Sequence, residues 1–331
     1  MSFAHVGIVG SGSWGTALAL LLHGQKLPVT LWGHDPEQVA RVAAARENAA
    51  YLPGVALPES LRFEAELESL AGCDLVLLAV PSKAMREMVA RLSTIGLGAD
   101  AVLLSCTKGV ERGSGWRMSQ IVSESFPQNP VAVLSGPSHA EEVAQRRPTA
   151  VVVGCADAAI NQRLQQAFST AFFRAYTSDD LPGIELGGAL KNIFALAAGV
   201  SDGLGLGDNS KAALVTRSLA EMVRLGTALG GRRETFHGLG GLGDLMVTCF
   251  SRHSRNRAVG ERLGRGEALG SIIASMNMVA EGVPTTYSAS ECARRLGVET
   301  PIIDQIRILL DGEARPQETL GALLSREPKA E

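Results

Sequence analysis

A glycine-rich turn close to the N-terminus constrains the fold of this chain more than any other feature. Gly10, Gly12 and Gly15 stand between a short apolar run and a helix-forming apolar series at 16–22, and a second apolar run follows at 28–33. A strand, a G-x-G-x-x-G turn, a helix and a strand thus follow one another within about 30 residues, as in dinucleotide-binding βαβ units. The N-terminus of such a helix offers backbone N–H groups to a pyrophosphate. The alternative is a purely structural glycine turn.

The end of the second apolar run bears on the choice between NAD and NADP. NAD-selective sites of this kind place a carboxylate there, which binds the ribose 2′-hydroxyl. This chain has Gly33 and His34 at that point and Asp35 one step later. Gly33 would leave room for a 2′-phosphate and His34 can contact the adenosine, although His34 is alternatively an ordinary loop residue. We expect Asp35 to cap a helix that begins at Pro36, and therefore NADP(H) as the preferred cofactor with NAD(H) possible.

The length of the chain, 331 residues, predicts about two domains. Up to about residue 180, near-continuous apolar strands alternate with helical segments, which predicts an α/β sheet covered on both faces. After Ser178 the strand signals stop and helical periodicity dominates. We predict an α/β Rossmann-like doubly wound sheet in a dinucleotide-binding domain at 1–180, and an all-α substrate-binding and catalytic domain at 181–331. The helices expected in the second domain lie at 184–200, 209–230, 255–264, 267–277, 285–296 and 301–310.

Three short segments follow strands of the predicted sheet. Ligands of doubly wound sheets bind outside the carboxyl ends of the strands, and Pro81, Lys108 and the turn 136–138 fall at such ends. Lys108 is therefore a candidate ligand residue, and a solvated loop lysine is the alternative.

Composition and charge exclude several classes of protein. The apolar content of 46% and charged content of 20% are typical of a soluble globular protein, and a net charge of −3 provides no basic field for nucleic acid or an anionic membrane. The five cysteines are scattered without a C-x-x-C pair, which argues against disulfides and structural zinc and for a reducing compartment. Residues 1–25 lack the basic start of a secretory leader. We expect a cytoplasmic protein with no metal, no nucleic-acid partner and no membrane-embedded segment.

Lys191 stands in an unusual position. It is the only charged residue between Leu186 and Val200, with Asn192 beside it. Lysine is almost never fully buried without a partner, and burial lowers its pKa. Either its head reaches water along the helix surface, or it is a catalytic acid or base whose pKa lies close to neutrality.

Two later segments favour a catalytic site. The glycine-dense stretch 237–249 contains Asp244, followed by Thr248, and an aspartate there would be well placed to bind an ammonium group. The stretch 251–266 then carries three arginines interleaved with polar residues, a compact set of donors for a small phosphate or carboxylate: Arg252, Ser254, Arg255, Asn256 and Arg257. The alternatives are a flexible linker for the first segment and a solvated helix face or a nucleic-acid patch for the second, and the balanced net charge argues against the last.

Eight motifs in order along the chain carry a family resemblance: "GSGSWGTALA", "LWGHDPE", "TKG", "SGPS", "ELGGALKN", "GLGGLGDLMVTC", "SRN" and "VAEG". With these motifs the chain closely resembles bacterial NAD(P)-dependent glycerol-3-phosphate dehydrogenase over essentially its whole length. The resemblance implies hydride transfer between a nicotinamide cofactor and glycerol 3-phosphate, a role in glycerophospholipid synthesis, and a homodimer.

The resemblance also implies roles for single residues. Lys191 matches the proton acceptor of the family, and Lys108 matches a lysine that contacts both substrate and cofactor. The other residues that match substrate contacts are Gly136, Ser138, Asp244, Ser254, Arg255 and Asn256. The other residues that match cofactor contacts are Ser13, Trp14, His34, Ala140, Arg255, Val279 and Glu281, which add to Gly10, Gly12 and Gly15 of the glycine turn. Ser138 stands where the family often has threonine, and Trp14 where tyrosine or phenylalanine is common, so the hydroxyl and the aromatic ring are retained.

Two other functions are compatible with the sequence. A related two-domain dehydrogenase of a 3-hydroxy acid would also carry a lysine in its helical domain. A non-catalytic NADP(H)-binding sensor would keep the glycine turn but would have no use for Lys191 beside Asp244.

Overall fold

The computed structural model describes residues 2–276 and 278–325 of the chain. The chain forms two compact units: unit 1 comprises Met1–Lys108 and Trp116–Glu185, and unit 2 comprises Gly109–Gly115 and Leu186–Glu331. The main division thus falls after residue 185, where the sequence places it near 180, and the short segment Gly109–Gly115 joins unit 2.

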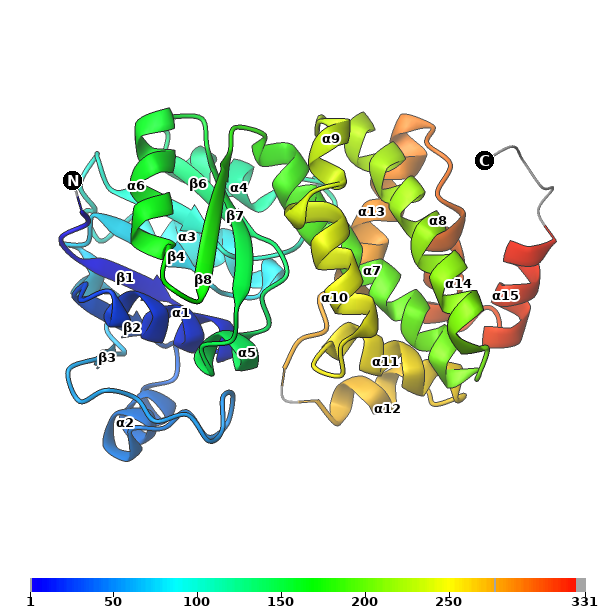
Figure 1. The fold of residues 1–331 in the computed structure, drawn as a ribbon, viewed down its shortest axis with the longest axis horizontal. Helices are drawn as coiled ribbons and strands as arrows, with labels where there is room; N and C mark the ends of the chain where they lie inside the picture. Colours follow the sequence, from blue (N-terminus) through cyan, green and yellow to red (C-terminus); the bar gives the residue numbers. More distant parts are fainter. Residues whose placement is uncertain (1, 277, 326–331) are drawn as a thin grey trace. The chain divides into compact units, whose positions relative to one another are not determined.

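Unit 1 is built on an eight-stranded sheet with the order β3-β2-β1-β4-β5-β6-β7-β8 (Figure 1). Its strands are β1 (Val6–Val9), β2 (Val29–Trp32), β3 (Arg62–Glu64), β4 (Leu75–Leu78), β5 (Val102–Ser105), β6 (Val131–Ser135), β7 (Thr149–Cys155) and β8 (Phe173–Ser178). Neighbouring strands from β3 to β6 are parallel, β7 runs antiparallel to β6, and β8 runs parallel to β7. Since chain order reverses between the neighbours β1 and β4, a ligand crevice is expected at their carboxyl ends.

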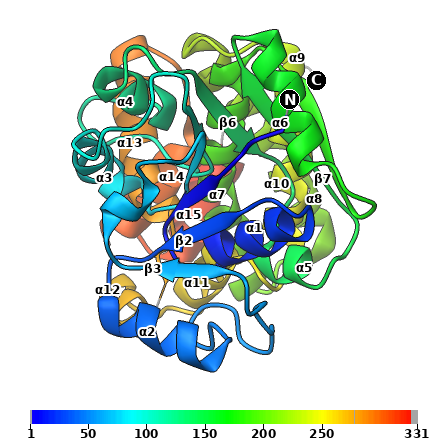
Figure 2. The same cartoon turned by 90° about the vertical axis from the view of Figure 1, so that its left-hand side faces the viewer.

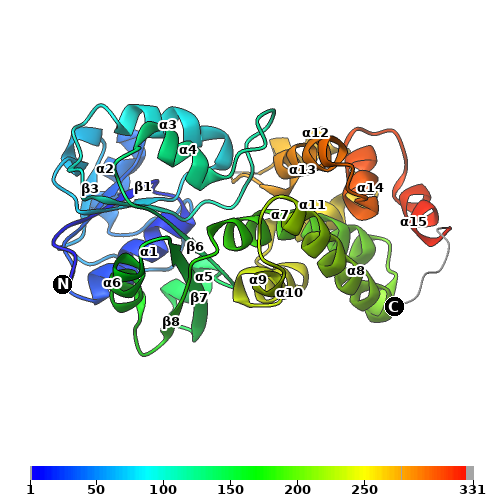
Figure 3. The same ribbon diagram turned by 90° about the horizontal axis from the view of Figure 1, so that it is seen from above.

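Helices cover both faces of this sheet, as Figures 2 and 3 show: α3 and α4 lie on one face, and α1 and α6 on the other. The helices of the unit are α1 (Ser13–Gly24), α2 (Pro36–Ala45), α3 (Met85–Leu92), α4 (Met118–Ser125), α5 (Ala140–Ala144) and α6 (Ala158–Phe168), with short 3-10 turns at Leu67–Leu70 and Ser82–Ala84. Along β4, Leu75 and Leu77 belong to the core beneath α1, while Val76 and Leu78 belong to the core beneath α3. Two covered faces explain why the strands are apolar almost throughout, and the predicted fold class is confirmed.

Unit 2 is helical. After α7 (Leu181–Gly203), which begins in unit 1, its elements are α8 (Gly207–Ala228), α9 (Arg233–Phe236), a π-helical turn η3 (Leu239–Gly243), α10 (Asp244–Phe250), α11 (Arg255–Gly264), α12 (Leu269–Ala274), α13 (Gly282–Leu296), α14 (Pro301–Leu310) and α15 (Pro316–Leu324). Helix α7 is long and apolar enough to cross a membrane, but its most apolar window is 100% buried inside the structure, as in the core helix of a globular domain.

Glycines set how closely α7 and α11 pack. A Cβ atom at Gly199 would lie 2.0 Å from the carbonyl oxygen of Arg257, and one at Gly260 would lie 2.0 Å from the carbonyl oxygen of Leu196. Any larger residue would push the two backbones apart. This contact places the first turn of α11 beside the C-terminal half of α7, and Asn256 of that turn reaches back to Asn192.

Glu221 of α8 caps the N-terminus of α14. Its carboxylate is 1% exposed and accepts hydrogen bonds from the backbone N–H groups of Ile302 and Ile303, at 3.0 and 2.8 Å. Burial raises the pKa of this carboxyl group from 4.5 to about 7, against the opposing effect of the two N–H donors.

This carboxyl group should make the stability of the protein depend on pH. Between pH 4.5 and about 7 the folded state binds more protons at Glu221 than the unfolded state, so the free energy of unfolding falls as pH rises through this range. We expect Glu221→Gln, which cannot titrate, to remove up to about 1.4 kcal/mol per pH unit of that slope. Urea unfolding of both proteins at pH 5, 6, 7 and 8 measures it. Equal slopes in the two proteins would mean that Glu221 has the same pKa in the folded and the unfolded state.

Candidate active site

The glycine turn after β1 has two glycines that the fold itself requires. Gly10 has φ +115°, and a Cβ atom there would lie 2.6 Å from the carbonyl oxygen of Ala79 in the neighbouring chain segment after β4. A Cβ atom at Gly15 would lie 1.9 Å from the carbonyl oxygen of Gly10. These contacts close the turn tightly against α1 and against the segment after β4.

Gly12 differs, because a Cβ atom there would meet nothing within 4 Å. It is the N-cap residue of α1, and no side chain caps that helix end. Nearby, the indole Nε1 of Trp14 is buried and has no hydrogen-bond partner among the described residues. An open surface at an uncapped helix N-terminus suits a phosphate group, and a buried unpaired donor is costly unless a ligand satisfies it. The turn therefore fits a dinucleotide pyrophosphate. Ser13, the first residue of α1, is buried in the same turn.

The end of β2 is more crowded than the sequence indicates. A Cβ atom at Gly33 would lie 2.6 Å from both Ser11 Oγ and Val39 Cγ2, so packing explains this glycine rather than room for a 2′-phosphate. Asp35 caps α2 as predicted, since its carboxylate accepts from the backbone N–H groups of Glu37 and Gln38 at 3.0 and 3.2 Å. His34 is exposed beside them.

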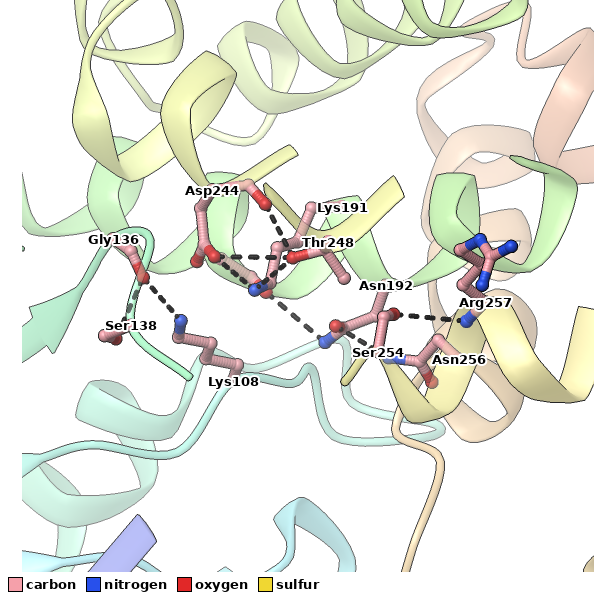
Figure 4. A network of polar contacts seen from close by, with 11 residues as sticks. Lys108, Gly136, Ser138, Lys191, Asn192, Asp244, Thr248, Ser254, Asn256 and Arg257 are labelled. Carbon is pink, nitrogen blue, oxygen red and sulfur yellow. Dashed lines mark hydrogen bonds and ion pairs between the residues drawn. The ribbon is translucent and has the colours of Figure 1, made fainter. Parts of the chain in front are cut away.

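Three predicted substrate residues of unit 1 lie together beyond β5 and β6. Lys108 Nζ donates to the carbonyl oxygen of Gly136 at 2.9 Å, and Ser138 Oγ donates to the same oxygen at 3.0 Å (Figure 4). Gly136 has φ +124°, and a Cβ atom there would lie 3.0 Å from Val151 Cα. Ala140, a predicted cofactor residue, is buried at the start of α5. The glycine turn and these residues all follow parallel strands, so they lie at one edge of the sheet.

Lys191 is buried in unit 2, only 6% exposed, and its amine does not reach water along the helix surface. Its Nζ forms a short ion pair with the carboxylate of Asp244 and donates to Thr248 Oγ1 at 2.8 Å (Figure 4). Thr248 Oγ1 donates in turn to the backbone carbonyl of Asp244 at 2.6 Å. Asp244 and Thr248 stand four residues apart on α10, which places both on the face that meets Lys191. The predicted pairing of Lys191 with Asp244 is present.

A second polar group, formed by two amides, lies where α7, α11 and α13 meet. Asn256 Nδ2 donates to Asn192 Oδ1 at 2.9 Å, and Asn256 Oδ1 accepts from the backbone N–H of Gly282 at 2.9 Å. Ser254 is buried and caps α11, its hydroxyl accepting from the backbone N–H of Arg257 at 3.2 Å. Residues of the motifs "SRN" and "VAEG" thus lie together beside Asn192.

Comparison with known proteins decides the family. Residues 5–161 match the family described as NAD-dependent glycerol-3-phosphate dehydrogenase N-terminus, and residues 180–321 match its C-terminus. The chain is 46% identical over 328 residues to the glycerol-3-phosphate dehydrogenase [NAD(P)+] of Chlorobium phaeobacteroides (strain BS1), covering 98% of each chain. It is 49% identical over 332 residues to that of Geobacillus thermodenitrificans, covering 99% of this chain and 96% of the relative.

A crystal structure of glycerol-3-phosphate dehydrogenase from Coxiella burnetii matches with a TM-score of 0.94 and 38% identity, over 98% of this chain and 99% of that one. The chain belongs to the NAD-dependent glycerol-3-phosphate dehydrogenase family. The family and the enzyme class expected from the sequence are thereby confirmed, and dependence on a nicotinamide cofactor follows from them.

In this dehydrogenase Arg255 and Arg257, which follow α10, do not form one group. Arg257 Nε pairs with Asp202 Oδ2 at 2.7 Å, and its Nη2 lies 3.5 Å from Glu261. Arg255 is exposed, and its Nη1 donates to the carbonyl oxygen of Val279 at 3.2 Å. The expectation of one compact set of anion donors is therefore wrong for Arg257, which pairs with two carboxylates that Lys211 and Arg265 also contact.

Sequence reasoning assigned no role to Thr248, although the structure brings it onto the Lys191 amine. The spacing D-x-x-x-T within a helix would have indicated it. Glu281, a predicted cofactor residue, is the N-cap residue of α13, half-buried beside Gly282. Among the residues that the structure describes, no cluster of three His, Cys, Asp or Glu side chains is arranged to hold a metal ion.

Proposed function

We propose that this dehydrogenase interconverts sn-glycerol 3-phosphate and dihydroxyacetone phosphate, and that it runs in the reductive direction to supply glycerol 3-phosphate for glycerophospholipid synthesis. The observation that carries the proposal is the buried Lys191 amine, bonded to Asp244 and Thr248, in a chain of this family.

Lys191 transfers the proton. In reduction its ammonium group hydrogen-bonds the C2 ketone oxygen and donates H⁺ to it as the hydroxyl forms, and in oxidation the neutral amine removes that proton. Asp244 and Thr248 fix the direction of the amine. The nicotinamide, when bound, supplies or accepts the hydride at its C4. The neighbouring amides and Arg255 orient the substrate, which lowers the barrier through binding energy remote from the reacting carbon.

The proposed substrate residues are those whose side chains or backbone gather in the polar groups described above. They are Lys108, Gly136, Ser138, Lys191, Asp244, Ser254, Arg255 and Asn256. Arg255 and Asn256 bind the phosphate, where a guanidinium offers paired donors to the phosphate oxygens.

The proposed cofactor is NADP(H) in preference to NAD(H). The residue at the end of β2 supports this, because Gly33 brings no carboxylate to the ribose 2′-hydroxyl. The capping of α2 also occupies Asp35. The residues proposed to hold the cofactor are Gly10, Gly12, Ser13, Trp14, Gly15, His34, Lys108, Ala140, Arg255, Val279 and Glu281.

We also propose a cytoplasmic homodimer. Support for a reducing compartment comes from the cysteines, all five of which are free and buried. Support for the dimer is the family resemblance alone, and light scattering of the purified protein measures it.

The function is tested by following NADPH oxidation with dihydroxyacetone phosphate and with unphosphorylated dihydroxyacetone. We expect kcat/KM to be about 10²-fold higher with the phosphate, because two or more charge-assisted hydrogen bonds are lost without it. Small 2- and 3-keto acids serve as controls for an acid dehydrogenase. Equal values with and without the phosphate would contradict the proposed substrate, and a higher kcat/KM with NADH than with NADPH would contradict the cofactor preference.

A further inference from the structure

A buried polar network lies beneath the glycine turn, and none of its members is among the residues proposed above. Its centre is Asn48, which is 0% exposed and lies in the loop between α2 and β3. Asn48 Nδ2 donates to the backbone carbonyl of Ser11 and to Thr16 Oγ1, both at 2.8 Å. Gln38 Nε2 donates to Asn48 Oδ1 at 3.4 Å, and Gln38 Oε1 accepts from Ser11 Oγ at 3.0 Å.

We propose that Asn48 is a positioning residue that holds the glycine turn in its cofactor-binding conformation. The carbonyl that it binds belongs to Ser11, which stands between Gly10 and Gly12 within the turn itself. The inference rests on the proposed role of that turn in binding the cofactor.

The peptide bond between Ser11 and Gly12 links Asn48 to the ligand side of the turn. No described peptide bond is cis, so the carbonyl of Ser11 and the N–H of Gly12 point in opposite directions in one plane. Because Asn48 binds that carbonyl from the inside of the protein, the N–H of Gly12 is directed away from the interior. The surroundings of Gly12 are open, because a Cβ atom there would meet nothing within 4 Å. Asn48 thereby aims a backbone donor at the place where a pyrophosphate would bind.

The loop that delivers Asn48 is closed on itself. Its ends meet through the N–H of Leu57, which donates to the carbonyl of Arg46 at 2.8 Å. The N–H groups of Tyr51 and Leu52 donate to the backbone carbonyl of Asn48 at 3.1 and 2.7 Å. Leu52, 1% exposed, packs into the core beneath α1. A compact loop anchored in this way fixes the position of Asn48 independently of any ligand.

The test compares Asn48→Ala with a matched control, Asn161→Ala. Asn161 is likewise buried in unit 1, and its Nδ2 also donates twice, in this case to the carbonyls of Cys155 and Ser178 at 2.7 and 3.0 Å, away from the glycine turn. We expect Asn48→Ala to raise the Kd for NADPH about tenfold, because the N–H of Gly12 would no longer point at the pyrophosphate. This is the usual effect of losing one hydrogen bond to a charged group. The value of kcat at saturating NADPH should change less than about threefold, and the control should change Kd less than twofold.

Other results would overturn the inference. If Asn48→Ala lowers the melting temperature while leaving the Kd for NADPH within twofold, or if Asn161→Ala weakens NADPH as much, Asn48 is only structural. If Asn48→Ala does not fold, Gln38→Met is the variant to use, because it removes one hydrogen bond of Asn48 and one of Ser11. We expect it to raise the Kd for NADPH about threefold. An unchanged Kd would overturn the proposal.

A further variant separates this inference from the proposed function. Gly12→Ala fits the structure, because Gly12 has φ −72° and open space around its Cβ position, so it affects a bound ligand rather than folding. If Gly12→Ala leaves NADPH binding unchanged, the proposed role of the turn fails and the inference with it. If Gly12→Ala weakens NADPH at least tenfold and Asn48→Ala does not, only the role of Asn48 fails.

Discussion

Replacing Lys191 by methionine is expected to lower kcat by at least about 10²-fold, the usual contribution of a general acid or base. Methionine has nearly the length of lysine and is apolar, so it fills the same buried space without an exchangeable proton. The Kd for NADPH should stay within about threefold, since no proposed cofactor contact is removed. Steady-state kinetics with dihydroxyacetone phosphate and a separate binding titration measure the two effects, and the loss should appear in kcat and in kcat/KM alike.

Lys211→Met is the matched control. Lys211 is also 6% exposed and also pairs with an aspartate, Asp202, at 2.8 Å, but Asp202 keeps a second cation, Arg257, when Lys211 is replaced. We expect kcat of this variant to fall less than about fivefold. Similar losses in the two variants would show that turnover responds to any disturbed buried charge in unit 2, and Lys191 would lose its assigned role.

The parts of the fold that could be predicted are those with local signals. The strand, turn and helix around Gly10 and Gly15 are specified by neighbouring residues, and α11 begins and ends where its periodicity indicates. The antiparallel direction of β7 depends on pairing with β6, and the assignment of Gly109–Gly115 to unit 2 depends on contacts distant in sequence. Neither leaves a local signal in the chain.

The same distinction holds for the site. Lys191 was recognisable because an ammonium in an apolar helix needs a partner, and Asp244 stood in a segment whose glycines allow close approach. The partners of the arginines were harder to predict, because residues two apart on a helix are rotated by about 200° around its axis. Arg255 and Arg257 therefore face different partners, although the sequence sets them almost side by side. The network around Asn48 could not have been predicted, since its members come from four segments: the glycine turn, α1, α2 and the loop after α2.

The buried pair of Lys191 and Asp244 is expected to dominate the stability of unit 2 whenever one partner is removed alone. Lys191→Met leaves the carboxylate of Asp244, 0% exposed, without its cation, and Asp244→Asn leaves the ammonium without its carboxylate. Each single change should cost about 3–5 kcal/mol, whereas the double variant Lys191→Met/Asp244→Asn should recover more than half of that loss, because no uncompensated charge stays buried. Calorimetry of the unaltered protein, the two single variants and the double variant measures these losses. It is chosen because the two units need not unfold together, and calorimetry resolves separate transitions.

Stability and catalysis should separate in that double variant. If the pair serves chemistry, restoring the melting temperature will leave kcat as low as in Lys191→Met, because neither an amide nor a thioether acts as a general acid or base near neutral pH. Additive losses in the cycle, with no recovery, would show that the two charges do not compensate each other. A double variant that regained both stability and turnover would mean that the pair serves only the packing of α7 against α10.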